Sequence, residues 1–391
     1  MEIKYADRLK KLPPYLFEEI DNAKQRALEE GRPIIDLGVG DPDQPTPDFI
    51  IKKLHEASLD PRTHKYAFNK GLKELRQVMG GWYKKRFNVD LDADSEILPL
   101  LGSKEGIAHV PMAFINPGDV VLVPNPGYPP YNSGAIFAGA EVHMMPLLEK
   151  NSFLPDLSSI SEDVARRCRL MHINYPNNPT GAVCDKNFYR EVIDFAKKYD
   201  IIVCSDAAYT EISYDGFTPI SFLEVPGAKD VGFEFHSLSK TFNMTGWRVG
   251  MAVGNARAIA GLAKIKSNID SGIFTPIQIA AIEAIKHADE VKQEIVELYT
   301  KRRDILVAGL REAGWNVTSP KAAFYIWAPV FGSYDSAGLA KAALEKADIV
   351  MTPGNGFGEF GEGYVRMTLT VDADKLKEAA VRIRKAFFSG S

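Results

Sequence analysis

The chain has few cysteines and no long apolar run, and each shortage excludes a class of protein. Only 3 cysteines occur in 391 residues. Cys168, Cys184 and Cys204 are odd in number and lack C-x-x-C spacing, so we expect structural thiols rather than a disulfide framework or a zinc site. No apolar run approaches the roughly 18 residues that span a bilayer. Charges also occupy the N-terminal stretch where a signal peptide needs its apolar segment, so we expect a cytoplasmic protein that does not span a membrane.

Neither sign of charge dominates the chain. The net charge is −4 and the basic runs are short, so the chain has no footprint of nucleic-acid binding. The 7 histidines show no metal-ligand spacing, and no G-x-S-x-G or Walker-type loop is present; we expect no metal. What is abundant is core-forming material, with 45% hydrophobic residues, which suits an enzyme of two or three domains.

Between about residues 97 and 254, short apolar runs alternate with helical patterns. Strands that alternate with helices predict an α/β fold with a mostly parallel sheet covered on both faces. Ligands of such sheets bind at the carboxyl ends of the strands. The candidate strands are ILPLL, DVVLVPN, EVHMMPL, RLMHINYP, DIIVCSDA, FEFHSLS and RVGMAVG.

The remaining segments predict a second, smaller α+β unit. Residues 255–313 have a long helical pattern that Gly272 and Pro276 interrupt, and the apolar runs NVTSP, AFYIWAPV, DIVMTPG and YVRMTLTV follow before a C-terminal helix. An amphipathic helix between Pro13 and Gly31 precedes the sheet region. We predict an N-terminal segment (1–45) that joins the small domain, a large domain (46–285) and a small C-terminal domain (286–391).

The stretch FEFHSLSKTFNMTGWRVG carries the clearest chemical signal. A lysine just past a strand, such as Lys240, is ordinarily a solvated surface charge. Here the hydroxyls of Ser237 and Ser239 and the planar charged fork of Arg248 surround it, and this donor set suits a phosphate. A lysine beside a phosphate-binding set suggests a Schiff base with the phosphate-bearing aldehyde pyridoxal 5′-phosphate.

Polar residues at the ends of other strands fit the same cofactor. Asp206 follows the strand IIVCS, where it could cap a turn or ion-pair with the ring nitrogen of the cofactor. Tyr209 would then donate to the phenolic oxygen of the ring. Asn178, in the turn NNPTG, could reach that same oxygen, and Tyr128 could stack on the ring or simply pack beside its prolines.

Three further motifs admit both a structural and a ligand-binding interpretation. The segment Gly102-Ser103-Lys104 lies between a strand and a helix, where free N–H groups attract a phosphate. The turn GVGDPDQPTP lets backbone approach a ligand, and Arg366, in an apolar strand, needs either a structural carboxylate or a substrate carboxylate. The G-x-G-x-x-G match at 356–361 is rejected as a dinucleotide site because a strand follows it.

The motifs GVGDPDQPTP, KYAFNKGLKELR, GSKEGI, PGYP, NYPNNPTG, SDAAYTE, SLSKTFNMTGWRVG and YVRMTL together resemble the class I and II aminotransferases, a family of fold-type I pyridoxal-phosphate enzymes. The resemblance spans nearly the whole chain. It implies a seven-stranded large domain and a smaller α+β domain. It also implies Lys240 as the Schiff-base lysine, Asp206 on the pyridine nitrogen, Asn178 and Tyr209 on the phenolic oxygen, Tyr128 over the ring, Ser103, Lys104, Ser237, Ser239 and Arg248 around the phosphate, and Arg366 on the substrate α-carboxylate.

The resemblance also implies a homodimer with shared active sites, in which Tyr66 reaches the phosphate bound by the neighbouring subunit. Within the family, GSKEGIAH, HINYPNNPTGAV and PGNGFGEFGEGYVRMTLT resemble the subgroup specific for LL-diaminopimelate. That subgroup implies amino exchange with 2-oxoglutarate in lysine biosynthesis. It implies substrate contacts from Tyr15 and Gly40, with Lys104, Tyr128 and Asn178 also in reach.

Several alternatives remain open on the sequence. The substrate could be alanine, aspartate or an aromatic amino acid, and the same cofactor also serves β-lyases. A non-catalytic regulator on this scaffold would need an appended DNA-binding segment, for which the first 32 residues are too few and insufficiently basic. The second arginine that aspartate-type enzymes use for a distal carboxylate has no counterpart that we can assign.

Overall fold

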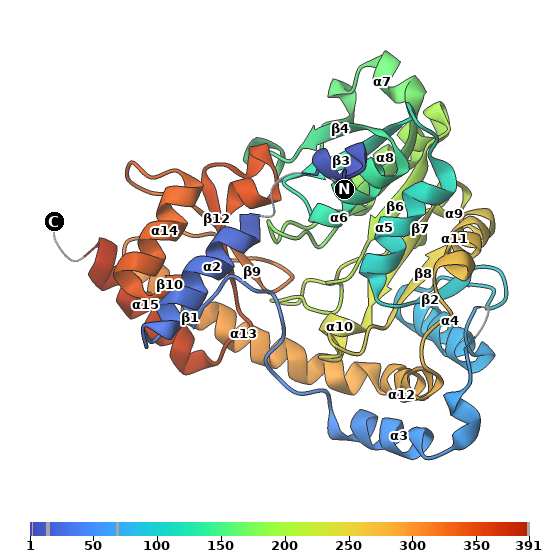
Figure 1. The fold of residues 1–391 in the computed structure, drawn as a ribbon, viewed down its shortest axis with the longest axis horizontal. Coiled ribbons are helices and arrows are strands. Elements are labelled where there is room, and N and C mark those ends of the chain that lie inside the picture. Colours follow the sequence, from blue (N-terminus) through green and yellow to red (C-terminus); the bar gives the residue numbers. More distant parts are fainter. Residues whose placement is uncertain (2, 13–15, 68–69, 389–391) are drawn as a thin grey trace.

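A seven-stranded sheet forms the centre of the molecule (Figure 1). The computed structural model describes residues 1, 3–12, 16–67 and 70–388. The strand order is β2-β8-β7-β6-β5-β3-β4, and all its pairings are parallel except those that β8 makes with β2 and β7. Its strands are β2 (Ile97–Leu100), β3 (Val120–Asn125), β4 (Glu141–Pro146), β5 (Cys168–Asn174), β6 (Ile202–Asp206), β7 (Gly232–Ser237) and β8 (Gly250–Gly254). All seven predicted strands are therefore present.

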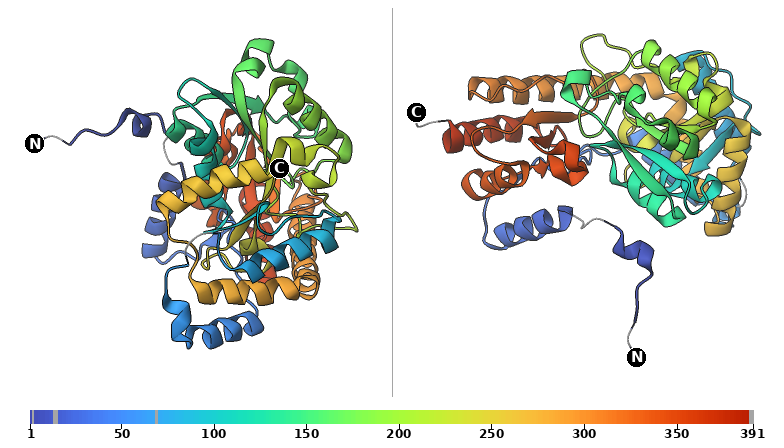
Figure 2. Two further views of the ribbon diagram at one scale, coloured as in Figure 1. Left: turned by 90° about the vertical axis from the view of Figure 1, so that its right-hand side faces the viewer. Right: turned by 90° about the horizontal axis from the view of Figure 1, so that it is seen from above.

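Helices cover both faces of this sheet, as the views in Figure 2 show. Successive side chains of a strand point to opposite faces. Accordingly Val121 and Val123 pack with α5, α6 and α11, whereas Val120 and Leu122 belong to the core that includes α4, α8 and α12. These helices are α4 (Lys73–Phe87), α5 (Ser103–Phe114), α6 (Pro129–Ala138), α8 (Lys186–Tyr199), α11 (Ala256–Ile269) and α12 (Thr275–Lys286). Shorter ones are α1 (Asp7–Lys10), α3 (Asp48–Ser58), α7 (Glu162–Arg167), α9 (Ala228–Val231) and α10 (Leu238–Thr241).

The C-terminal part forms a second layer of helices and strands, to which the long helix α13 (Ala288–Glu312) leads (Figure 1). Its antiparallel sheet has the order β11-β12-β9, made by β9 (Tyr325–Pro329), β11 (Thr352–Pro353) and β12 (Tyr364–Thr368). The helices α14 (Ser336–Ala347) and α15 (Ala373–Phe387) pack beside it. The N-terminal segment joins this part, because β1 (Ile35–Asp36), which follows α2 (Leu16–Glu29), pairs in parallel with β10 (Ile349–Val350). The domain boundaries stay a prediction.

Two details differ from the predicted pattern. The run NVTSP is not a strand. The side chain of Val317 is buried although its backbone pairs with no strand, and Pro320 has no N–H for a ladder hydrogen bond. The predicted long helix is three helices. The first break falls near Gly272 as expected, where φ is +89° and a Cβ would lie 2.2 Å from the carbonyl oxygen of Ala67. A second break, at His287, was not predicted. No helix in the described ranges is long and apolar enough to cross a membrane.

Candidate active site

A cavity of about 400 Å³ opens at the carboxyl ends of β5, β6 and β7. The side chains that line it come from both the large sheet and the C-terminal part, since Asp206 ends β6 whereas Tyr325 and Arg366 belong to β9 and β12. The predicted residues that it brings together are Gly40, Ser103, Lys104, Tyr128, Asn178, Asp206, Tyr209, Ser237, Ser239, Lys240, Arg248 and Arg366. Motifs spread from residue 40 to residue 366 thus converge on one wall.

Lys240 is not a solvated surface lysine. It lies in α10, a four-residue helix that begins directly after β7. Its Nζ donates to the carbonyl oxygen of Gly40 at 2.8 Å and lies 5.4 Å from the centroid of the Phe324 ring. Burial lowers the pKa of Lys240 to about 8. An amine with this pKa is partly neutral near neutral pH, as a nucleophile and a proton acceptor require.

Backbone and hydroxyl donors at the start of α5 and at the end of β7 form an anion seat. Ser103 is the first residue of α5, where free N–H groups favour an anion. A Cβ on Gly102 would lie 2.3 Å from Arg248 Nη2, so only glycine leaves room for that guanidinium. Ser237 and Ser239 line the same wall, and their local bond runs from Ser239 N to Ser237 Oγ at 3.2 Å. The set fits a phosphate.

Asp206 is buried and points into the cavity from the end of β6. It accepts from Tyr131 Oη at 2.7 Å and from Ala208 N at 3.2 Å, so it both caps the turn and faces the cavity. Burial raises the pKa of Asp206 to about 6. A cationic ring nitrogen beside it would favour the ionised form. Tyr131 was missed, although its position three residues after Tyr128 at the start of α6 is a signal that the sequence carries.

Two tyrosine hydroxyls meet beside Lys240. Tyr209 Oη and Tyr325 Oη are 2.8 Å apart, and both residues line the cavity. Burial raises the pKa of each phenol, so both are protonated at neutral pH; one O–H donates to the other oxygen, which leaves one O–H to donate to a ligand. Tyr325 was not predicted to take part. A Cβ on Gly40 would lie 2.3 Å from the Tyr325 hydroxyl. A glycine at position 40 therefore leaves the space that this hydroxyl occupies.

Arg366 is buried without a structural carboxylate. Its Nη1 donates to Asn178 Oδ1 at 2.9 Å and its Nη2 to the carbonyl oxygen of Gly38 at 2.7 Å. In the part of the chain that the structure describes, it makes no ion pair and its buried Nε has no hydrogen-bond partner. The structural ion pair that the sequence left open is therefore absent from these residues, and a bound anion would fill the need. Because Asn178 Oδ1 accepts from Arg366, the Asn178 amide nitrogen is left to donate into the cavity.

Two predicted residues are not among those that line the described cavity. Tyr66 is 74% exposed and does not line the cavity of its own chain. Tyr15 lies outside the described residues. Tyr128 does line the cavity, and its ring meets that of Tyr131 edge-on at 5.7 Å between centroids.

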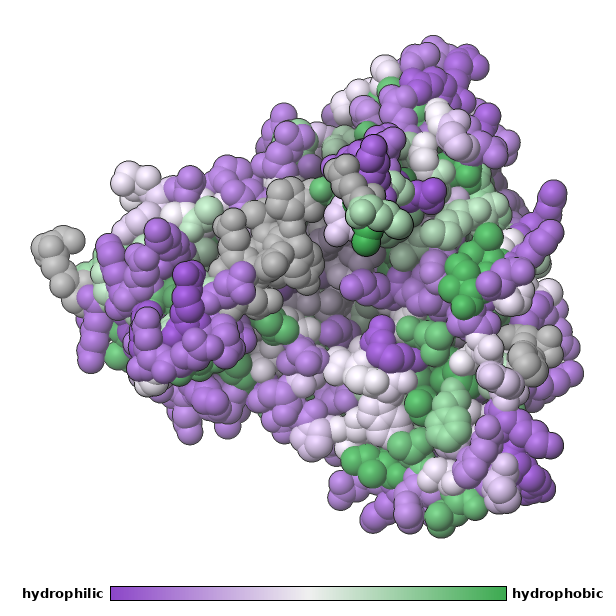
Figure 3. All heavy atoms as spheres, in the orientation of Figure 1, coloured by the Kyte–Doolittle hydropathy of each residue, from purple (hydrophilic) through white to green (hydrophobic). Residues whose placement is uncertain are grey.

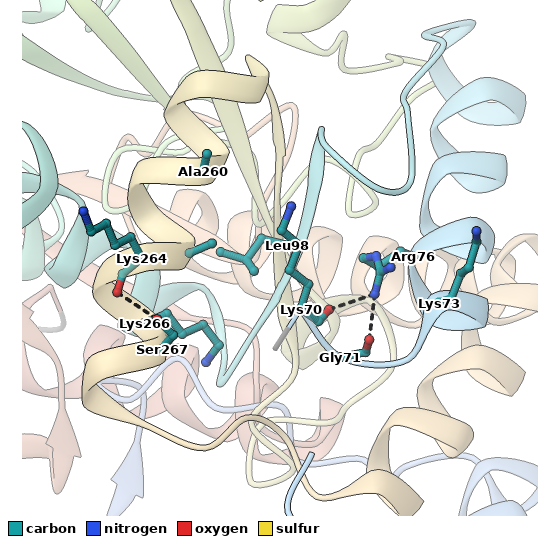
Figure 4. A pocket seen from close by; sticks show the side chains of 10 residues that line it. Lys70, Gly71, Lys73, Arg76, Leu98, Ala260, Lys264, Lys266 and Ser267 are labelled. Atoms are coloured by element: carbon teal, nitrogen blue, oxygen red, sulfur yellow. Dashed lines mark hydrogen bonds between the residues drawn. The ribbon is translucent and has the colours of Figure 1, made fainter. Parts of the chain in front are cut away.

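A second hollow, of about 590 Å³, contains none of the predicted residues (Figure 4). Its wall carries basic side chains from α4 and α11, but their charges are used locally. Arg76 Nη1 donates to the carbonyl oxygens of Lys70 and Gly71, and Lys266 pairs with Asp270 at 2.8 Å. We assign no function to this hollow. Within the described ranges, no cluster of His, Cys, Asp and Glu could hold a metal ion.

The chain belongs to the class I and II aminotransferases, whose family profile matches residues 32–383. It is 55% identical over 381 residues to an LL-diaminopimelate aminotransferase of Halothermothrix orenii, covering 97% of this chain and 98% of that one. A relative of the same name from Syntrophobacter fumaroxidans is 54% identical over 383 residues, or 98% and 99% of the two chains. The substrate-bound structure of BacF from Bacillus subtilis is 39% identical, with a TM-score of 0.94 over 98% of both chains. The predicted family and fold class are thus confirmed, and the family implies pyridoxal phosphate.

Proposed function

We propose that this chain is an LL-diaminopimelate aminotransferase that exchanges an amino group with 2-oxoglutarate. The observation that carries the proposal is one cavity in which Lys240, Asp206 and Arg366 are brought together, the last without a carboxylate partner among the described residues. The names and high identity of the relatives support the substrate. In lysine biosynthesis the reaction would run from tetrahydrodipicolinate to LL-diaminopimelate, in the cytoplasm.

The cavity offers a place for each part of pyridoxal 5′-phosphate. When bound, that cofactor supplies a ring that accepts the electrons released at the substrate Cα. Asp206 would hold the ring nitrogen, Asn178 and Tyr209 the phenolic oxygen, and Tyr128 a ring face. The groups for the phosphate are Ser103, Ser237, Ser239, Arg248 and the backbone N–H of Lys104 in the first turn of α5, which leaves the Lys104 ammonium for the substrate.

The residues of the chain supply orientation and proton transfer. Arg366 would hold the α-carboxylate through Nε and its unused N–H groups, which places the substrate Cα near Lys240. Lys240 would hold the cofactor aldehyde, and its amine would be placed to remove the proton from the substrate Cα. Such positioned proton transfer contributes about 10²–10⁴-fold. Gly40 lies beside the substrate path, and Lys104, exposed on the cavity wall, would bind the distal carboxylate.

We further propose that two copies form a homodimer in which Tyr66 completes the site of its neighbour. Three large hydrophobic residues are exposed to solvent: the exposed fraction is 74% for Tyr66, 52% for Ile269 and 46% for Phe274. The rings of Phe274 and His64 are 6.3 Å apart, so the segment that leads to Tyr66 lies beside the segment that follows Ile269. Figure 3 shows further hydrophobic side chains on the face that carries α3 and α12. A second copy that covers such a patch would bury it.

The absorbance spectrum of the purified protein, before and after addition of LL-diaminopimelate, tests the catalytic proposal. We expect a band of lysine-bound cofactor that collapses to the pyridoxamine form with this donor, and that is missing from the Lys240→Ala variant. If the band persists with LL-diaminopimelate but collapses with glutamate, alanine or an aromatic amino acid, the specificity is wrong. Absence of any band after addition of pyridoxal phosphate would overturn the site built around Lys240.

A further inference from the structure

The cavity wall carries a carboxylate that the proposed chemistry does not use. Among the described residues that line the cavity, only Asp41 and Asp206 are acidic. Asp206 is buried and accepts from Tyr131, whereas Asp41 is exposed, and its side chain has no hydrogen bond or ion pair with any described residue. Asp43, two positions on, differs: both of its oxygens accept from Arg302 at 2.7 Å. Asp41 is therefore available to a ligand.

Hydrogen bonds hold the backbone of the turn that carries Asp41, because each of the three carbonyl groups before it accepts from a side chain. The carbonyl oxygen of Gly38 accepts from Arg366 and from Thr352, and that of Val39 accepts from Thr370 at 2.9 Å. The carbonyl oxygen of Gly40 accepts from Lys240. The two side chains proposed to hold and to deprotonate the substrate thus also fix the backbone that carries Asp41. A site held in this way keeps its charge at a defined place relative to the substrate.

The other charged side chains on the wall are basic; Arg248 is assigned to the phosphate and Lys240 to the cofactor, which leaves Lys104 and Arg366 for the substrate. A cationic wall suits a substrate with more than one carboxylate, but a carboxylate in that wall repels such a substrate unless the substrate brings a cation to it. The negative charge of Asp41 also acts on Lys240, because it opposes the lowering of the Lys240 pKa by burial. Asp41 therefore faces the same space as the reacting amine.

We propose that Asp41 binds the distal ammonium of the substrate and so selects a dicarboxylic acid with an amino group at each end. This inference rests on the proposed function and deepens it. With the α-carboxylate on Arg366 and the α-amine toward Lys240, a chain of methylene groups carries the second amino-acid head to the exposed side of the cavity. There Asp41 and Lys104 offer one negative and one positive charge, which match the ammonium and carboxylate of that head.

A pair of donors that differ only at the distal amine tests this assignment: LL-diaminopimelate and L-2-aminopimelate. In the holoenzyme, Asp41→Asn should lower kcat/KM for LL-diaminopimelate about 10- to 100-fold, mainly through KM, because one charged hydrogen bond is lost. The value for L-2-aminopimelate should stay constant or rise. Calorimetric titration of the Lys240→Ala variant, with and without Asp41→Asn, should show the same split in dissociation constants.

Asp48→Asn is the matched control, because Asp48 is an exposed carboxylate nearby in the chain that does not line the cavity. It should leave both donors unaffected, and Asp41→Glu should restore part of the preference. Equal losses on both donors would mean that Asp41 acts through Lys240 or the fold and would overturn the inference, as would no loss at all. A wild-type enzyme that transaminates other amino acids but not LL-diaminopimelate would overturn the proposed function itself, and this inference with it.

Discussion

Burial is the largest cause of the pKa shifts of the charged side chains in the cavity, and neighbouring groups moderate each shift. Burial lowers the pKa values of Lys240 and Arg366 and raises that of Asp206, because taking a charge out of water disfavours the charged form. For Arg366 the charge survives, since even a lowered guanidinium pKa stays above neutrality. For Lys240 the consequence is a reactive amine.

The first prediction concerns that amine. In the cofactor-free protein, labelling of Lys240 by an amine reagent, followed by mass spectrometry, should rise with pH around a midpoint of about 8, against the ordinary value of 10.5. Between these two values the unfolded chain holds more protons on this lysine than the folded one, so its contribution makes the free energy of unfolding rise with pH there. Lys240→Met should remove that slope. A midpoint at the ordinary lysine value would contradict the burial of Nζ.

At this scale the sequence predicts residues that stand in a recognisable local motif and misses those that act across the fold. Lys240 and Arg366 were predicted from their neighbours. Tyr131 and Tyr325 were not, because their hydroxyl partners, Asp206 and Tyr209, lie 75 and 116 positions away along the chain. Only the packed fold shows which partners these phenols bond to.

Among the elements, β7 is the one that positions Lys240. Phe233 and Phe235 pack on the side of α5 and α11, and the alternate residues face the other core. There the fully buried carboxylate of Glu234 accepts from Tyr83, Ser205 and Ser221, from the backbone N–H of Phe222, and from His236. These bonds tie β7 to α4, to β6 and to the capped turn at 221–224. A buried charge is retained only when it is satisfied in this way.

Replacing Glu234 with glutamine should destabilise the fold, because the amide places an N–H₂ group among hydrogen-bond donors. We expect the free energy of unfolding, measured in urea, to fall by about 1–3 kcal/mol. Tyr83→Phe, which removes one donor, should cost about 1 kcal/mol.

Burial alone would raise the pKa of Glu234, but the bonds from His236, Ser221 and Phe222 leave it below its ordinary value. The carboxylate therefore contributes stability above the unfolded pKa, and the difference between wild type and Glu234→Gln should narrow as pH falls. A constant difference down to strongly acidic pH would contradict this.

For the whole molecule, the alternation of strands and helices was enough to predict the fold class, all seven strands and a mostly parallel sheet, but not which strand runs in the opposite direction. The exception is β8, which runs antiparallel to β7. The link from Ser237 to Gly250 contains only the short helix α10, so it doubles back instead of crossing the sheet. The apolar run RVGMAVG predicts a strand but does not indicate whether that strand is parallel or antiparallel to its neighbours. The strand order and the pairing of β1 with β10 likewise depend on contacts between distant segments.

Assembly of two chains is the property of the whole molecule on which the proposed role of Tyr66 depends. If Tyr66 serves the neighbouring cavity, inactive Tyr66→Ala and Lys240→Ala chains should complement one another when they are unfolded and refolded together with cofactor. A hybrid dimer then contains one cavity with an intact Lys240 that receives Tyr66 from the other chain. Random pairing should restore about a quarter of wild-type activity, since half of the dimers are hybrids and each has one complete site.

The control mixes Asp206→Ala with Lys240→Ala. Because Asp206 and Lys240 line the cavity of one chain, every site in this hybrid lacks one of them, and no activity should return. Recovery in the first mixture alone therefore separates a residue supplied by the partner from residues supplied by the same chain. Tyr66 is largely exposed and lies away from its own cavity, which is the arrangement that complementation needs. Failure of the first mixture, or a mass by light scattering equal to a single chain, would assign Tyr66 a role on its own surface only.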